Sequence, residues 1–151
     1  MFTKERTKSE EITSQSRLHK IPKAEAEARM KILIAAFGLE RYLNYPVNSY
    51  SGGVKRRLDI ALNMMSNPKI LFLDEPTVGM DLQSRQAMHI MMKKIRRDFG
   101  TTIFLTTHYL EEAQALADSI GILSRGRLTA QGSAEAVRRL PRAAQKICAD
   151  I

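Results

Sequence analysis

The chain has 151 residues and a net charge of +8 at pH 7, with 44% hydrophobic and 26% charged residues. Its length limits it to one domain, and the composition is that of an ordinary globular protein. The basic residues are scattered, and no aromatic residues interleave with them as a base-stacking surface requires, so we expect no nucleic-acid partner. The single cysteine excludes an internal disulfide and a cysteine-based zinc site.

No apolar run reaches the roughly 20 residues that a membrane span needs. The first 20 residues are polar and charged, which is typical of neither a signal peptide nor a span. We therefore expect a cytoplasmic chain that reaches a membrane only through another subunit. Residues 1–21 lack periodicity and are expected to form a loose tail, as are residues 140–151.

The segments between these tails alternate between two patterns of hydrophobicity. In chain order they predict a helix over 22–37, a loop over 42–50, a helix over 51–67, a strand over 69–74, a helix over 83–97, a strand over 101–106, a helix over 109–117, two strands over 120–123 and 127–130, and a helix from 133. The first strand is continuously apolar, which fits burial on both faces of a parallel sheet. The alternation predicts an α/β fold whose ligands lie beyond the carboxyl ends of the strands.

Ser51, Gly52 and Gly53 open the second predicted helix. A helix N-terminus offers unpaired N–H groups and the positive end of the helix dipole, and glycine lets a phosphate approach the backbone closely. The three residues therefore form a candidate phosphate site. The alternative is a serine N-cap followed by a glycine turn.

Polar side chains follow both predicted parallel strands. Asp74 ends the first strand and is a candidate Mg²⁺ ligand, while the adjacent Glu75 could orient and deprotonate a water. His108 follows the second strand, where it could donate a hydrogen bond to a terminal phosphate. The alternatives are a strand that simply ends in polar residues and a structural histidine. Asp81, after a glycine turn, either caps the next helix or communicates between subunits.

These pieces, in this order, resemble the C-terminal part of the ATP-binding subunit of an ABC transporter. The matching segments are the signature motif at Ser51–Gly53, Walker B and the catalytic glutamate at Leu71–Glu75, the D-loop at Thr77–Asp81, the switch histidine at His108 and the late hairpin at Gly126–Gly132. The resemblance covers residues 22 to about 139 and implies a partial P-loop NTPase fold. The residues around the signature resemble the drug, antibiotic or polysaccharide exporter branch.

The chain departs from the family pattern in two respects. Val54 stands where the signature usually ends in glutamine, and no phosphate-binding loop of the form G-x-x-x-x-G-K-[ST] (Walker A) occurs in the 151 residues. Gly121 and Gly126 have the glycine spacing of such a loop, but Arg127 and Leu128 follow in place of Lys and Ser/Thr. The resemblance thus implies that the chain begins inside the helical subdomain.

The resemblance implies ATP and Mg²⁺ as cofactors. Asp74 would hold Mg²⁺, Glu75 and His108 would act in hydrolysis, and Ser51–Gly53 and Asp81 would meet the ATP of a partner subunit. The implied partners are a second ATP-binding subunit, arranged head to tail, and a membrane-spanning permease, which places the chain peripherally on the cytoplasmic face. Without Walker A, we expect the chain to be inactive alone. Two alternatives remain: a partner that donates only its signature, and a head lobe of a non-transport ATPase.

Overall fold

The computed structural model describes residues 22–139, so the predicted tails at 1–21 and 140–151 lie outside the described residues. The described chain divides into two compact units. Unit 1 contains residues 22–71 and 77–103, and unit 2 contains residues 72–76 and 104–139. Within the described residues, no helix combines the length and the apolar character needed to cross a membrane.

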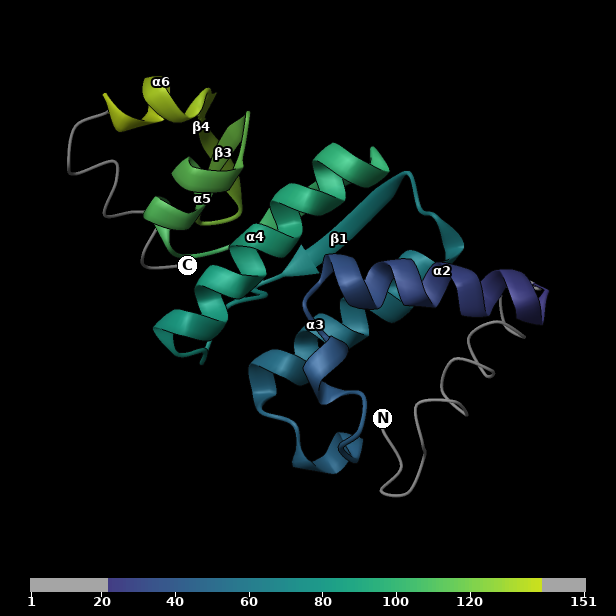
Figure 1. Ribbon diagram of the computed structural model, residues 1–151. Coiled ribbons are helices and arrows are strands. Elements are labelled where there is room, and N and C mark those ends of the chain that lie inside the picture. Colours follow the sequence, from purple (N-terminus) through teal and green to yellow (C-terminus); the bar gives the residue numbers. More distant parts are fainter. Residues whose placement is uncertain (1–21, 140–151) are drawn as a thin grey trace. The chain divides into compact units, whose positions relative to one another are not determined.

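Unit 1 is built around three helices, α2 (Lys23–Ala36), α3 (Gly52–Asn63) and α4 (Leu82–Phe99). Helix α3 packs against both α2 and α4 (Figure 1). Two short 3₁₀ turns, η1 (Glu40–Tyr42) and η2 (Val47–Ser49), lie between α2 and α3, and a third, η3 (Met64–Ser66), follows α3. The predicted loop over 42–50 therefore contains local helical turns, and α4 ends at Gly100, whose φ of 63° is one that glycine adopts without strain.

The core of unit 1 is rich in methionine. Six methionine side chains from α2, α4 and η3 are 2% exposed or less: Met30, Met64, Met65, Met88, Met91 and Met92. Methionine is unbranched and fills irregular gaps between helices. On α4, the buried residues Met88, Met91, Met92 and Ile95 recur at helical spacing and form one apolar stripe.

Strands β1 (Ile70–Asp74) and β2 (Thr102–Thr106) are neighbours in one sheet. The backbone N–H of Thr102 donates to the carbonyl of Lys69 at 2.9 Å, and that of Glu75 donates to Thr106 at 3.1 Å. The first bond joins the starts of the two strands and the second joins their ends, so β1 and β2 run parallel. Helices therefore connect parallel strands, and the predicted α/β fold with a parallel sheet is confirmed.

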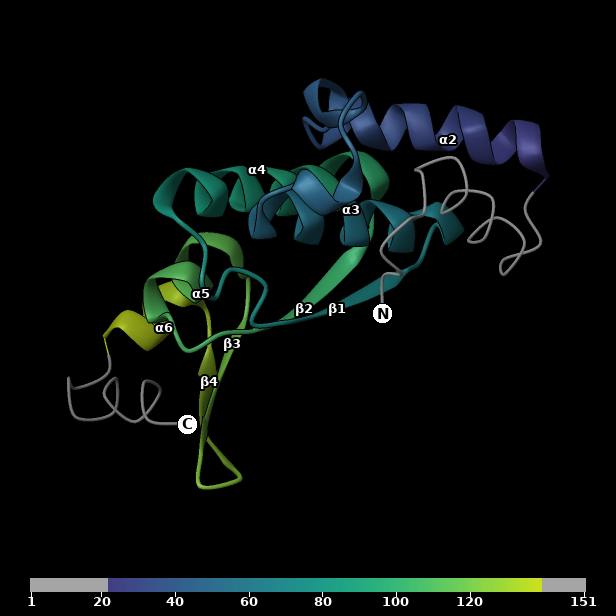
Figure 2. The ribbon, with the colours of Figure 1, turned by 90° about the horizontal axis from the view of Figure 1, so that it is seen from below.

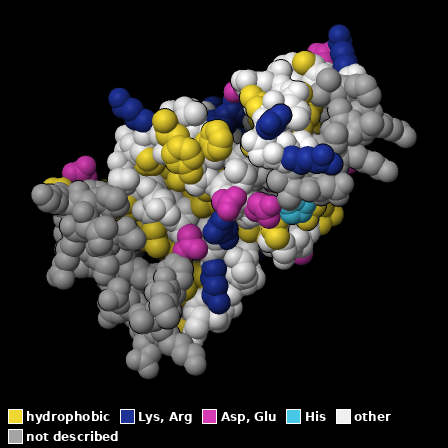
Figure 3. Space-filling model, turned by 180° about the vertical axis from the view of Figure 1, so that it is seen from behind, with side chains coloured by type: hydrophobic (Ala, Val, Ile, Leu, Met, Phe, Trp, Pro, Cys, Tyr) yellow, Lys and Arg dark blue, Asp and Glu magenta, His cyan; other side chains and the backbone are white. Residues whose placement is uncertain are grey.

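The prediction that β1 is buried on both faces is wrong for the described residues. Leu71 and Leu73 are buried, but Ile70 and Phe72 on the alternate positions are 53% and 71% exposed. Phe104 of β2 is also exposed, and its ring centroid lies 5.5 Å from that of Phe72. Hydrophobic side chains are prominent on the face shown in Figure 3. An uninterrupted apolar run shows that a strand is compatible with burial on both faces. Each face is buried only if another element packs against it.

Unit 2 contains a hairpin of β3 (Ile120–Ser124) and β4 (Arg127–Gly132) with helices α5 (Leu110–Leu116) and α6 (Ala134–Arg138) (Figure 2). The strands pair antiparallel, and the turn uses Arg125 and Gly126 at φ 49° and 73°. The core of this unit is small, since Ile120, Ile122 and Val137 are its buried centre. The predicted late hairpin is confirmed.

Candidate functional site

The predicted phosphate site lies at the N-terminus of α3. Ser51 is the N-cap residue, and its hydroxyl oxygen accepts a hydrogen bond from the backbone N–H of Val54 at 3.4 Å. The predicted capping interaction is thus present. The remaining N–H groups of the first turn have no intrahelical acceptor and point out of the helix end, which is the arrangement that binds an anion.

The two glycines of this motif have different surroundings. Both lie within α3, so they form its first turn and not a separate glycine turn. An added Cβ on Gly52 would meet nothing within 4 Å, whereas an added Cβ on Gly53 would lie 2.8 Å from Ser84. Gly53 is therefore required by the close approach of α4, while Gly52 leaves the helix end open.

Asp81 lies at the N-terminus of α4, in the same unit as α3. The turn before it is closed by a bond from the N–H of Met80 to the carbonyl of Thr77 at 3.2 Å, with Gly79 at φ 73°. The Asp81 carboxylate accepts bonds from the backbone N–H and the hydroxyl of Ser84 at 2.8 and 2.7 Å. Of the two interpretations drawn from the sequence, the helix cap is confirmed.

Asp74 and Thr106 end the two neighbouring strands of the sheet and are bonded to each other. The hydroxyl of Thr106 donates to Oδ1 of Asp74, and it also accepts from the backbone N–H of Glu75 at 3.2 Å. The Asp74 carboxylate is exposed and belongs to unit 2. Thr106 therefore helps to fix the orientation of the Asp74 carboxylate.

Glu75 and His108 lie next to each other beyond the strand ends. Oε1 of Glu75 is 3.2 Å from Nδ1 of His108, and both side chains are about one-third to one-half exposed. Glu75 has a φ of 41°, a left-handed conformation that is uncommon for a residue with a side chain. The chain turns sharply there, directly before Pro76.

The described residues contain no group of three or more His, Cys, Asp or Glu side chains that could hold a metal by themselves. Mg²⁺ usually binds proteins through one or two carboxylates, with waters and substrate phosphates completing its octahedron. Asp74, positioned by Thr106, fits such a site only when a phosphate supplies further oxygens.

The predicted site residues fall into two groups. Asp74, Glu75 and His108 come together in unit 2, and Ser51–Gly53 and Asp81 come together in unit 1. Two contributors were not assigned a role from the sequence, namely Thr106, which bonds to Asp74, and Ser84, which contacts Gly53. Thr106 could have been identified from the sequence, because it is the polar residue that ends an apolar strand. No sequence pattern pointed to Ser84.

Comparison with known proteins decides the family. The family model described as ABC transporter matches residues 1–78, slightly more than half of the chain. The chain belongs to the ABC transporter family. The ABC resemblance inferred from the motifs is therefore confirmed, and the match includes the signature and the Asp74-Glu75 strand.

Curated relatives include drug-resistance and Nod factor export ATP-binding proteins. The daunorubicin/doxorubicin resistance ATP-binding protein DrrA of Streptomyces peucetius is 42% identical over 127 residues, which cover 84% of this chain and 38% of the relative. The Nod factor export ATP-binding protein I of Ralstonia nicotianae is 38% identical over 128 residues, covering 83% of this chain and 39% of the relative. The chain thus spans well under half the length of these relatives.

Solved structures of ABC ATPases also match. An ATP-binding subunit of an ABC transporter superposes with a TM-score of 0.73 and 29% identity, covering 92% of this chain and 57% of the other. The cbiO1 protein of Clostridium perfringens, part of the transporter complex cbiONQ, gives a TM-score of 0.71 and 27% identity, covering 83% and 54%. The fold is therefore that of part of an ABC ATPase domain.

Proposed function

We propose that this chain is the signature- and Walker B-bearing part of an ATP-hydrolysing subunit that powers an ABC exporter. The observation that carries the proposal is the set of hydrogen bonds at the carboxyl ends of β1 and β2, which joins Thr106 to Asp74 and Glu75 and places His108 against Glu75. Ligands of parallel α/β sheets bind at such ends. The Nod factor export ATP-binding protein among its relatives favours export as the direction of transport.

The unit 2 residues have complementary chemical roles in this proposal. Asp74 helps to hold Mg²⁺, which when bound with ATP would neutralise charge developing on the phosphates. Glu75 orients a water and accepts its proton, and His108 keeps the Glu75 carboxylate in place and donates toward the terminal phosphate. The hydroxyl of Thr106 keeps Asp74 in one orientation, so that little reorganisation is needed when the nucleotide arrives.

The unit 1 residues serve the ATP of a second subunit. Ser51 and the open first turn of α3 would bind the phosphates of ATP held by the phosphate loop of that subunit, in a head-to-tail pair. Asp81 lies beside this helix end and would face the same partner. A membrane-spanning permease completes the assembly, and the chain lies peripherally on the cytoplasmic face of the membrane. The proposed assembly contains no nucleic acid.

The test needs a phosphate loop upstream of this chain. We would fuse the chain behind the residues that precede the matched region in the Streptomyces peucetius relative, where the family resemblance expects that loop. Glu75→Gln should lower ATP turnover by about 10²–10⁴-fold, because the proton acceptor is lost, while ATP binding persists. Glu111→Gln, an exposed acid on α5, is the matched control and should leave turnover unchanged. Full ATP turnover by the Glu75→Gln fusion would contradict the proposed catalytic role of Glu75.

A signature donor remains the second candidate, favoured by the capped N-terminus of α3, where Ser51 and the two glycines form a phosphate site that is separate from Asp74 and Glu75. In that case the chain would restore ATP turnover to a complete relative whose own signature serine is changed to arginine. Rescue should depend on Ser51, since Ser51→Arg fills the phosphate position, but not on Glu75. Rescue that is insensitive to Ser51→Arg would exclude this candidate.

A further inference from the structure

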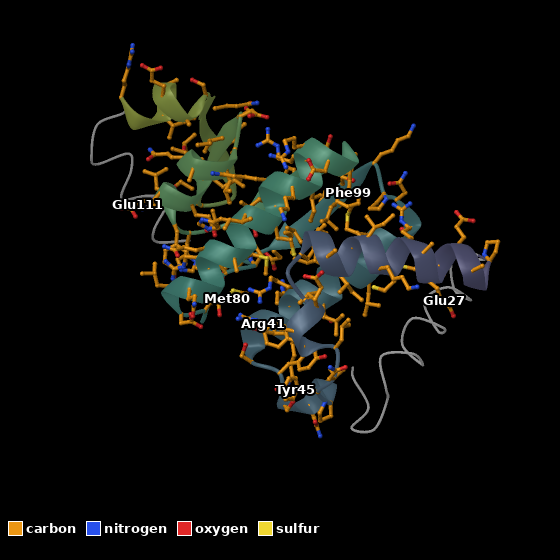
Figure 4. The ribbon with its side chains drawn as sticks, in the orientation of Figure 1. Glu27, Arg41, Tyr45, Met80, Phe99 and Glu111 are labelled. Atoms are coloured by element: carbon orange, nitrogen blue, oxygen red, sulfur yellow. The ribbon has the colours of Figure 1, made fainter. Side chains whose placement is uncertain are left out.

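The N-termini of α3 and α4 meet at a contact between Gly53 and Ser84. A Cβ added to Gly53 would lie 2.8 Å from both Cβ and Oγ of Ser84, and 3.8 Å from Sδ of Met80. Met80, labelled in Figure 4, directly precedes the N-cap of α4. Side-chain carbons do not approach this closely, so the two helix ends are as near to each other as a glycine permits.

Ser84 is engaged on its other side by Asp81. Its hydroxyl donates to Oδ2 of Asp81 at 2.7 Å and its backbone N–H donates to Oδ1 at 2.8 Å, so both carboxylate oxygens are occupied by one residue. The hydroxyl bond is also the largest cause that lowers the pKa of Asp81 below its ordinary 3.8. A simple N-cap needs only the backbone N–H. The hydroxyl bond therefore adds a constraint beyond capping.

We propose that Ser84 is a positioning residue that holds the phosphate-binding end of α3 and the Asp81 carboxylate at one fixed separation. The inference rests on the proposed function, in which both groups meet the same neighbouring subunit. Since Gly53 touches Ser84 and Ser84 bonds to Asp81, α3 cannot shift toward α4 without displacing the hydroxyl from the carboxylate. The two groups thus meet the partner as one rigid surface, which reduces the ordering that binding requires.

The test uses the full 151-residue chain and measures the pKa of Asp81 by ¹³C NMR of its carboxyl group. Gly53→Ala should raise the Asp81 pKa toward 3.8, because the new methyl group displaces the Ser84 hydroxyl. Gly52→Ala is the matched control, one position earlier in the same helix with no atom within 4 Å, and should leave the pKa unchanged. Amide spectra of each variant establish that it is folded.

A second pair of variants separates the steric contact made by Ser84 from the hydrogen bond made by its hydroxyl. Ser84→Ala removes the hydroxyl but retains the Cβ that a methyl on Gly53 would strike, whereas Ser84→Gly removes both. Adding Gly53→Ala should therefore perturb the Ser84→Ala protein, seen as shifted amides at the start of α4, but not the Ser84→Gly protein. The proposal is overturned if folded Gly53→Ala keeps the wild-type Asp81 pKa, or if Gly53→Ala perturbs both backgrounds equally.

A functional arm uses the fusion protein described above and measures ATP-dependent dimerisation. Ser84→Ala should weaken dimerisation although Ser51 and Gly53 are intact, and a dimer as stable as wild type would overturn the positioning role. Failure of the proposed function would give a different experimental result. The wild-type fusion would then not dimerise with ATP at all, while the Asp81 pKa would still respond to Gly53→Ala.

Discussion

The two groups of site residues are held in different ways. In unit 1, Gly53 is buried against α4, in a unit whose core contains six buried methionines. In unit 2, Asp74, Glu75 and His108 are at least partly exposed and are held mainly by hydrogen bonds to Thr106 and to each other. Close packing therefore constrains Gly53 in the first group, whereas hydrogen bonds orient the side chains of the second group. Substitutions at the buried Gly53 should thus affect stability as well as binding, whereas isosteric side-chain changes at the strand ends should affect mainly chemistry.

The largest expected effect is a loss of stability when the methionine-rich core of unit 1 is changed. Met91 is 1% exposed, so Met91→Ala should destabilise the chain by about 2–5 kcal/mol through the cavity that it leaves. The neighbouring Ile90 is 58% exposed, and Ile90→Ala should cost less than about 0.5 kcal/mol. Urea denaturation followed by circular dichroism measures both. Equal losses for the two variants would mean that the methionine core does not support unit 1.

The exposed aromatic pair in unit 2 should contribute less. Phe72→Ala removes a ring that packs on Phe104 but is 71% exposed, so we expect a loss of about 0.5–1.5 kcal/mol. It should also reduce self-association, seen by light scattering, since exposed apolar strands are prone to aggregate. Leu73→Ala, at a 6% exposed position of the same strand, should cost about 2–5 kcal/mol. A cost for Phe72→Ala as large as for Leu73→Ala would contradict the exposed face.

Glu75 offers a way to separate stability from chemistry. Its φ of 41° is unfavourable for any residue with a Cβ, so Glu75→Gly should be more stable than Glu75→Ala by about 0.5–1 kcal/mol, after the entropy that glycine gains in the unfolded chain. Both variants should lose ATP turnover in the fusion. Thermal unfolding gives the difference, and a glycine variant less stable than the alanine variant would show that the left-handed conformation is not retained.

The smallest effect concerns Asp59 on α3. Partial burial raises its pKa above 3.8, although Arg56 opposes the shift. The folded state therefore prefers the protonated form, and stability falls as pH rises from 3.8 through the raised pKa. Asp59→Asn should gain up to about 0.5 kcal/mol at pH 7 and nothing near pH 3. Urea titrations at both pH values measure this, and a gain that is the same at both would refute the burial effect.

Local sequence patterns predicted the elements and their ends. The caps at Ser51 and Asp81 were predictable from the sequence, because a cap is a hydrogen bond between residues three positions apart. The order of the motifs predicted the family, which the comparisons confirmed. The roles of Asp74, Glu75, His108 and the signature residues stay predictions, to be tested by the variants above.

Tertiary structure decided what lies between elements distant in the sequence. The bond from Thr106 to Asp74 requires that β1 and β2 be neighbours, and the contact of Gly53 with Ser84 requires a particular approach of two helices. The exposure of Phe72 likewise depends on which elements cover the sheet and not on the strand itself. Sequence periodicity specifies the face that an element can bury, because it follows from local backbone geometry. The partner on that face, and the distance to it, are set only when the whole chain packs.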